Sequence, residues 1–120
     1  MTLHTIYNQT RATTLARHAE LADSFGRRGL GLMGRRSLPE GGGLILLPNN
    51  NIHMFFMRFP IDVVFANREH QIVGMRHRFK PWRPFAGVLA ARYTIELPAG
   101  ILAATNTEVG DQLQITPGWR

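Results

Sequence analysis

Cysteine is absent from the 120 residues, and this absence removes several chemistries at once. Without a thiol, the chain can form no disulfide framework, no thiolate zinc site, no iron–sulfur cluster and no cysteine nucleophile. Serine is also scarce, because Ser24 and Ser37 are the only two, and neither lies in a G-x-S-x-G motif. The sequence therefore offers no recognisable nucleophile for acyl transfer.

Long hydrophobic runs are missing as well. The longest apolar stretches, 44–47 and 85–91, fall far short of the roughly 20 residues that a membrane-spanning helix requires. Residues 1–20 contain no apolar signal segment followed by a small-residue cleavage site. We therefore expect no membrane span and a cytoplasmic location.

Lysine is nearly absent, because Lys80 is the only one among 14 basic residues. These 14 face 8 acidic residues, which gives a formal net charge of +6. Such a field attracts anions, acidic surfaces and nucleic acid without specificity. The excess of arginine is typical of a GC-rich coding bias, and it is also compatible with selection for planar anion recognition.

The length and the apolar content predict a single domain over residues 1–120. A chain of this size buries about two thirds of the surface that its unfolded form exposes, which suffices for a core without covalent cross-links. At 44 % hydrophobic and 18 % charged residues, it is too apolar to be disordered.

Short apolar segments separated by glycine and proline predict a mainly β fold, a β-sandwich or small barrel with one or two short helices. Residues 12–22 fit either a helical stripe or a strand, and the Ala22-Asp23-Ser24 boundary favours a strand. Further strands are expected at 44–47, 53–57, 61–65, 71–79, 90–97 and around 113–115, with helical turns at 24–33 and 101–104. The residues predicted to be buried are Phe55, Met57, Ile61, Val63, Phe65, Tyr93, Ile95 and Leu97.

Four blocks of sequence carry a resemblance to a known family. They read GLGLM at 29–33, HMFFMRFPIDVVF at 53–65, ELPAG at 96–100 and VGD at 109–111. In this order and spacing, over residues 15–115, the sequence resembles the DUF192 (UPF0127) family. The resemblance implies a compact, mostly β domain without an established biochemical activity.

The second block departs from the commoner form of that family. There, a polar stretch of the Lys-Asn-Thr type separates the methionine from Pro-Leu-Asp, whereas here only Arg58 and Phe59 separate Met57 from Pro60. Any site that relatives build on that asparagine and threonine is therefore absent or remodelled in this chain. Many relatives also look exported or lipid-anchored.

Asp62 is the most informative single residue, because it lies in an otherwise apolar run. A buried carboxylate must be paired or hydrogen-bonded, since leaving it alone costs several kcal/mol. It could bind a ligand or act as a general base. Alternatively, it could tie down a neighbouring loop through backbone N–H groups, accept from amides around Pro60, or pair with Arg58. The structural interpretation is favoured.

His53 opens a predicted strand and could move a proton or bind a metal. A metal site needs three or four converging ligands, and the sequence has no HxH or HExxH spacing. We therefore expect no metal and no cofactor, and we interpret His53 as a hydrogen-bonded residue at a strand mouth.

Residues 76–83, with sequence RHRFKPWR, interleave cations and aromatic rings as a single-strand-binding surface does. Alternation favours a plain strand with Met75, His77 and Phe79 inward and the cations in solvent. If this surface binds nucleic acid, the binding residues are Arg76, Arg78, Lys80, Trp82 and Arg83.

The sequence as a whole favours a small binding module that is non-enzymatic or weakly enzymatic. Its cleft, between the Gly29–Met33 segment and the His53–Asp62 strand pair, would take an anionic small molecule or an acidic peptide. The candidate ligand-binding residues are His53, Arg58, Asp62, Gly29 and Met33. The first alternative is an enzyme that uses Asp62 with His53 or Arg58 as an acid–base pair. The second is a weak, non-specific nucleic-acid binder.

Overall fold

The computed structural model describes residues 2–22, 38–52, 59–80 and 86–119. This part of the chain contains nine strands and one helix. They are β1 (Leu3–Asn8), β2 (Thr13–Ala22), β3 (Gly42–Leu46), β4 (Asn51–Ile52), β5 (Ile61–Ala66), β6 (Ile72–Phe79), β7 (Ala86–Gly87), β8 (Tyr93–Pro98), α2 (Ile101–Ala104) and β9 (Leu113–Thr116).

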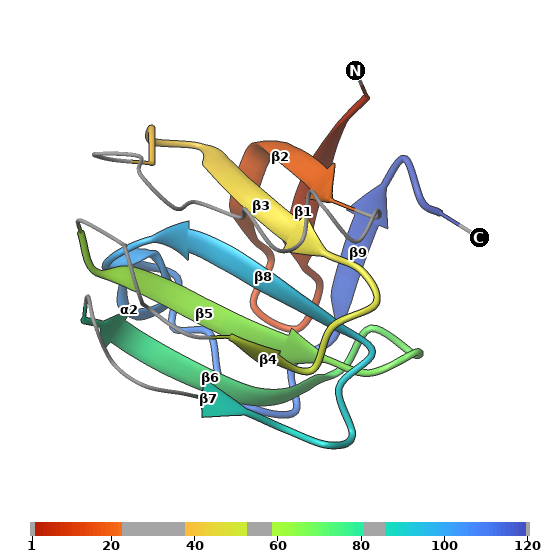
Figure 1. Ribbon diagram of the computed structural model, residues 1–120. Helices are drawn as coiled ribbons and strands as arrows, with labels where there is room; N and C mark the ends of the chain where they lie inside the picture. The colour runs from red at the N-terminus through yellow and green to blue at the C-terminus, as the bar shows by residue number, and fades with distance from the viewer. Residues whose placement is uncertain (1, 23–37, 53–58, 81–85, 120) are drawn as a thin grey trace.

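Seven strands form one curled sheet in the order β6-β5-β8-β3-β2-β1-β9, while β4 and β7 pair separately (Figure 1). All neighbours in the large sheet are antiparallel except β2 and β3. The two outer strands approach each other at one end, where Gln71 bridges Gln112 and the Ile72 N–H donates to the Asp111 carbonyl at 3.0 Å. The sheet is therefore a curled half-barrel, and its two outer strands are joined by hydrogen bonds at one end.

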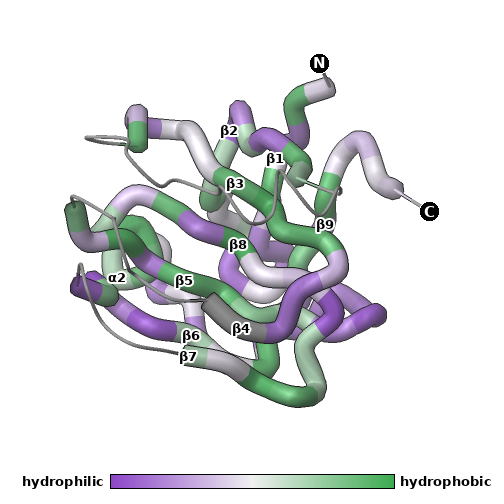
Figure 2. Tube along the Cα trace, viewed as in Figure 1, coloured by the Kyte–Doolittle hydropathy of each residue, from purple (hydrophilic) through white to green (hydrophobic). Residues whose placement is uncertain are grey.

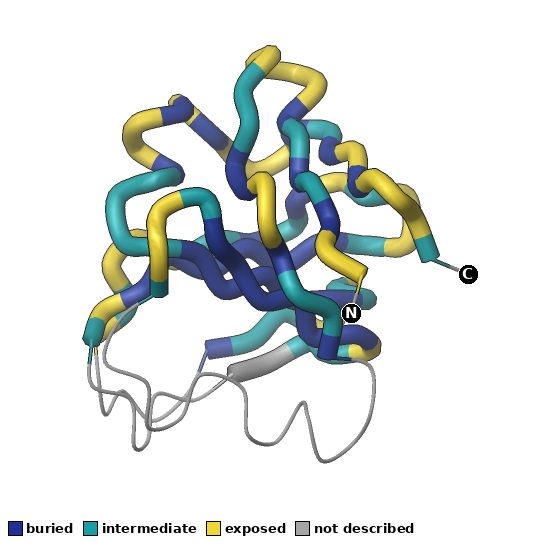
Figure 3. The backbone as a smooth tube through the Cα atoms, turned by 90° about the horizontal axis from the view of Figure 1, so that it is seen from above, coloured by how far each residue is buried: buried dark blue, intermediate teal, exposed yellow. Residues whose placement is uncertain are grey.

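Apolar side chains cover both faces of the central strands. One cluster includes Ile45, Val64, Ile95 and Leu102, and a second on the opposite face is centred on Phe65. Every residue of β3 and of β5 is buried, and apart from Asp62 both strands consist of apolar residues and glycine (Figure 2). Figure 3 shows the buried residues along the middle of the sheet and the exposed ones mainly in turns.

The mainly β prediction is confirmed. Residues 13–22 form a strand, as favoured for the segment 12–22, and 101–104 form the short helix. Six of the eight predicted core residues are at most 1 % exposed, namely Ile61, Val63, Phe65, Tyr93, Ile95 and Leu97. Phe55, Met57, the expected strand at 53–57 and the expected helix at 24–33 lie outside the described residues.

Strand β1 is an element that the sequence analysis did not predict. Its buried positions are His4, Ile6 and Asn8, so two of the three inward side chains are polar. Each polar side chain has a partner: His4 Nδ1 bonds the Pro117 carbonyl at 2.6 Å, and Asn8 donates to Asp111 at 2.9 Å. Polar residues that face inward hide a strand from any search for alternating apolar residues.

Candidate functional site

Asp62 lies in an irregular part of the β5–β6 ladder. Ile61 pairs with Phe79 and Val63 pairs with Arg76, so two residues of β6, His77 and Arg78, face the single Asp62. This β-bulge places Arg78 at a φ of 46° and turns its N–H to Asp62 Oδ1, at 2.8 Å. The bulge thus presents a backbone donor to the carboxylate.

The other carboxylate oxygen holds the start of α2. Asp62 Oδ2 accepts from the Gly100 N–H at 3.1 Å and from the Leu102 N–H at 2.9 Å. The side chain has no exposed surface. The prediction that Asp62 is buried and hydrogen-bonded is confirmed. Its donors belong to β6, to the β8–α2 connection and to α2 itself, whereas amides around Pro60 were also expected, and in this conformation no surface is left for a ligand.

The remaining sequence candidates for a ligand site lie outside the described residues. A cleft between them, and an acid–base pair of Asp62 with His53 or Arg58, therefore stay predictions. The residues concerned are Gly29, Met33, His53 and Arg58.

The described part of the basic run lies on β6 and directly after it, at the edge of the sheet. Arg76, Arg78 and Lys80 are exposed, as the strand interpretation predicts, while Met75 and Phe79 are partly buried. The expectation that His77 points inward is wrong, because the bulge places both of its residues in solvent. The second half of β6 is accordingly hydrophilic (Figure 2). Trp82 and Arg83 lie outside the described residues.

Charges and a bulge on an outer strand have a structural effect of their own. Both discourage an edge strand from pairing with another chain. In addition, the Arg76 guanidinium bonds the carbonyl of neighbouring Met75 at 2.8 Å. The described cations of this run are thus compatible with protection of a sheet edge as well as with a binding surface.

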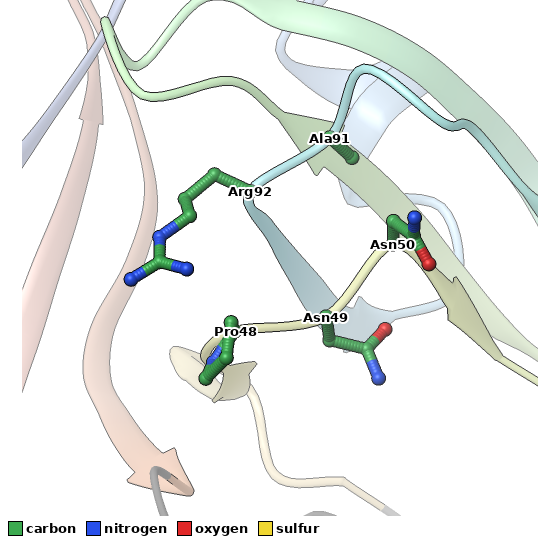
Figure 4. Close-up of a pocket in the computed structure, with 5 residues that line it drawn as sticks. All are labelled: Pro48, Asn49, Asn50, Ala91 and Arg92. Atoms are coloured by element: carbon green, nitrogen blue, oxygen red, sulfur yellow. The ribbon is translucent and has the colours of Figure 1, made fainter.

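A pocket of about 260 Å³ lies where the β3–β4 loop meets the loop before β8. It is lined by one arginine, two asparagines and two small apolar residues: Pro48, Asn49, Asn50, Ala91 and Arg92. Figure 4 shows the Arg92 side chain extending past Pro48, while the two carboxamides point away from it. Sequence reasoning assigned these residues only to a loop and to the face of a strand.

The backbone around Arg92 is fixed by hydrogen bonds on both sides. Its N–H donates to the Ala66 carbonyl at 2.7 Å, and its carbonyl accepts from the Asn49 N–H at 2.9 Å. Thr94 Oγ1 donates to the Asn49 side-chain oxygen at 2.9 Å, which orients that carboxamide. Within the described part of the chain, no carboxylate pairs with the Arg92 guanidinium, whereas Arg11 pairs with Glu108 and Asp111. Among the described residues, Arg92 thus contributes a positive charge beside the pocket that no carboxylate compensates.

The described residues include no group of three or more histidine and acidic side chains that could hold a metal ion. They also include no helix long and apolar enough to cross a membrane.

The fold and the pocket together define a small, mainly β half-barrel with one short helix and a polar recess between two loops. A structure of this kind is similar to a protein of unknown function from Novosphingobium aromaticivorans, with a TM-score of 0.81 and 19 % identity over 94 % of this chain and 84 % of that one. It is equally similar to a putative transcription regulator from Sinorhizobium meliloti, with a TM-score of 0.81 and 21 % identity over 92 % and 90 % of the two chains. At these identities the likeness shows the fold alone.

Sequence comparison supplies the family. The family model DUF192, described as "Uncharacterized ACR, COG1430", matches residues 6–115. A UPF0127 protein of Pyrococcus furiosus is 37 % identical over 89 % of this chain and 94 % of its own length, and one of Pyrococcus abyssi is 34 % identical over 91 % and 95 %. The chain belongs to the DUF192 (UPF0127) family, and the predicted resemblance is confirmed. This is a family of unknown function.

Proposed function

We propose that the protein is a small binding module and that the pocket at Arg92 takes a small anionic molecule. The observation that carries the proposal is Arg92, a residue that lines the pocket and whose guanidinium has no ion-pair partner among the described residues. A guanidinium binds a carboxylate or a phosphate through two parallel hydrogen bonds, and such charge-assisted bonds are about twice as strong as neutral ones.

The size of the pocket limits the ligand. Sites for drug-sized molecules usually occupy about 300–1,000 Å³. The 260 Å³ here suits a molecule with few atoms beyond its anionic group. The net charge of +6 raises the local concentration of such anions, and Pro48 and Ala91 offer an apolar wall for a short carbon chain.

The proposal is compatible with contacts between the same ligand and the ligand-binding residues predicted from the sequence. The chain passes from the pocket loop into β4 (Asn51–Ile52), and His53 follows directly in sequence. The proposal itself rests on Arg92 and does not require His53 or Arg58.

The test is a thermal-shift screen with small mono- and dicarboxylates and inorganic phosphate, because a ligand of the native state raises its melting temperature. The matched variants are Arg92→Gln and Arg17→Gln, which remove the same charge from the pocket and from an exposed position on β2. We expect at least one anion to raise the melting temperature of the wild type and of Arg17→Gln, but not of Arg92→Gln. Equal responses of the two variants, or no response of the wild type, would overturn the proposal.

A further inference from the structure

A cluster of aromatic and imidazole rings lies where the chain continues beyond β9. Residues 117–119, here called the strap, follow β9 and bring Trp119 against three rings from other elements. These are His4 of β1, His70 of the β5–β6 turn and Tyr93 of β8. Their positions in the sequence are far apart, so only the fold brings them together.

The contacts have the geometry of a ring held in a fitted recess. The indole of Trp119 meets Tyr93 edge-to-face with ring centroids 5.1 Å apart, His70 at 5.7 Å and His4 at 6.0 Å. Aromatic pairs prefer such T-shaped arrangements at about 4.5–7 Å. Three walls around one ring therefore select for a flat aromatic group.

Two of the three walls, Tyr93 and His70, are held by hydrogen bonds that do not involve the strap. Tyr93 is 1 % exposed, and its hydroxyl is hydrogen-bonded to His70 Nδ1 at 2.8 Å. Burial raises the pKa of Tyr93 above its ordinary value, so the hydroxyl stays protonated. The turn places His70 at a φ of 65°, and its N–H donates to the Asn67 carbonyl at 3.0 Å.

The strap is held less firmly. Within the described residues, positions 117–119 form no backbone–backbone hydrogen bond, and the one hydrogen bond to the strap joins His4 Nδ1 to the Pro117 carbonyl. Pro117 and Gly118 are exposed, and Trp119 is half-buried. A segment with so few bonds can leave the surface at low cost, unlike the strands beneath it.

We propose that the recess formed by His4, His70 and Tyr93 is a binding site for a planar aromatic ligand, and that Trp119 occupies it in cis. A free ligand must displace Trp119, whose effective concentration is on the order of millimolar or higher because it is tethered. His4 Nδ1, which bonds the Pro117 carbonyl in the closed state, then becomes available to an acceptor on the ligand. His4 and Trp119 lie outside residues 6–115, the range that the family model matches.

Indole is the probe that tests this directly, because it is the ring of Trp119 without the chain. In Trp119→Ala the recess is vacated, so we expect indole to bind with one-to-one stoichiometry by calorimetry and to raise the melting temperature. In the wild type the apparent affinity should be at least about tenfold weaker, because the tethered ring competes. Cyclohexanol, a saturated ring with a hydroxyl group, should not bind the variant detectably.

A second variant keeps the test decisive if Trp119→Ala fails to fold. Trp119→Leu keeps an apolar side chain over the recess but removes the indole, and it leaves His4, His70 and Tyr93 unchanged, so its affinity for indole should lie between those of Trp119→Ala and the wild type. His18→Ala removes an exposed histidine from β2 and should behave as the wild type does. The proposal is overturned if no folded variant binds indole, or if all of the proteins bind it equally well.

Discussion

At the scale of single residues, two buried carboxylates are held by donors from distant parts of the chain. Asp62 accepts three backbone N–H bonds. Asp111, 3 % exposed, accepts from the Asn8 side chain at 2.9 Å, from Arg11 Nε at 3.0 Å and from the Glu108 N–H at 2.9 Å. Each joins segments that the sequence keeps far apart, so each acts as a tie between elements.

Replacement of Asp62 by alanine leaves three N–H groups without their acceptor. We expect Asp62→Ala to lower the free energy of unfolding by about 1–3 kcal/mol, measured by urea denaturation. Asp62→Asn should cost less, because the amide oxygen still accepts from the Gly100 and Leu102 N–H groups and only the bond from the Arg78 N–H is lost, since the NH₂ group cannot accept it. An alanine variant as stable as the wild type would contradict this role.

The pH dependence of stability should report Asp111. Burial raises the pKa of this carboxyl, but hydrogen bonds from Arg11, Asn8 and the Glu108 amide outweigh burial and lower it below its ordinary value of 3.8. A carboxyl whose pKa is lower in the folded state stabilises the fold above its unfolded pKa, and that contribution is lost as the pH falls through the folded pKa.

We therefore expect the unfolding free energy to decrease as the pH falls below about 4, with part of the decrease due to Asp111. Asp111→Asn should be less stable at pH 7 and should lose that part of the pH dependence. The measurement is a series of urea titrations from pH 7 to pH 2. Identical slopes for variant and wild type would show that Asp111 does not contribute.

Sequence reasoning anticipated half of the Asp62 site. A charged residue inside an apolar run must be satisfied, so its burial with hydrogen bonds followed from physical chemistry alone. The identity of its donors could not be predicted in this way, because the Gly100 and Leu102 amides lie 38 and 40 residues further along the chain. Only the pairing of β5 with β8 brings them near. Long-range partners of this kind leave no local pattern.

At the scale of elements, the strands with apolar inward faces were recognised and the strand with polar ones was missed. Tyr93, Ile95 and Leu97 alternate clearly and are buried in β8, although Thr94 and Glu96 on the other face are buried too. When the second face of a central strand is polar, the sequence alone does not show whether that face is buried or exposed. The bulge in β6 was equally invisible, and it reversed the orientation of His77.

The connection into α2 provides a test of backbone geometry at this scale. Gly100 has a φ of 99°, and a Cβ there would lie 3.1 Å from an Arg78 guanidinium nitrogen. Gly110 has a φ of 97° with no atom within 4 Å of its added Cβ, so it serves as a matched control.

We expect Gly110→Ala to destabilise the fold by about 1–2 kcal/mol through backbone strain alone. Gly100→Ala should cost about the same, because the Arg78 guanidinium is the end of a long, exposed side chain and can move away from the added Cβ. Arg78→Ala should therefore leave the cost of Gly100→Ala unchanged. Thermal and urea denaturation of the single and double variants measure this. A clearly larger cost of Gly100→Ala that Arg78→Ala relieves would show instead that the Arg78 side chain is held in place.

At the scale of the whole molecule, the net charge of +6 raises the question of nucleic acid. Part of that charge is distributed over several exposed positions of the described chain, including Arg17, Arg68, Arg76, Arg78 and Lys80. A diffuse field of this kind attracts phosphates without reading a sequence, and its binding weakens steeply as salt displaces it. If a dedicated surface bound nucleic acid, the loss of affinity would instead come mainly from substitutions on one element.

We therefore expect single-stranded oligonucleotides to bind with a dissociation constant no tighter than about 10⁻⁶ M at physiological salt. Two double variants separate the diffuse field from a surface on β6: Arg76→Gln with Arg78→Gln, and Arg17→Gln with Arg68→Gln. Each pair removes two charges, so fluorescence anisotropy across a salt series should show the same loss of affinity for both. A loss confined to the β6 pair, or a sequence-selective complex that persists at physiological salt, would instead establish the basic strand edge as a nucleic-acid interface.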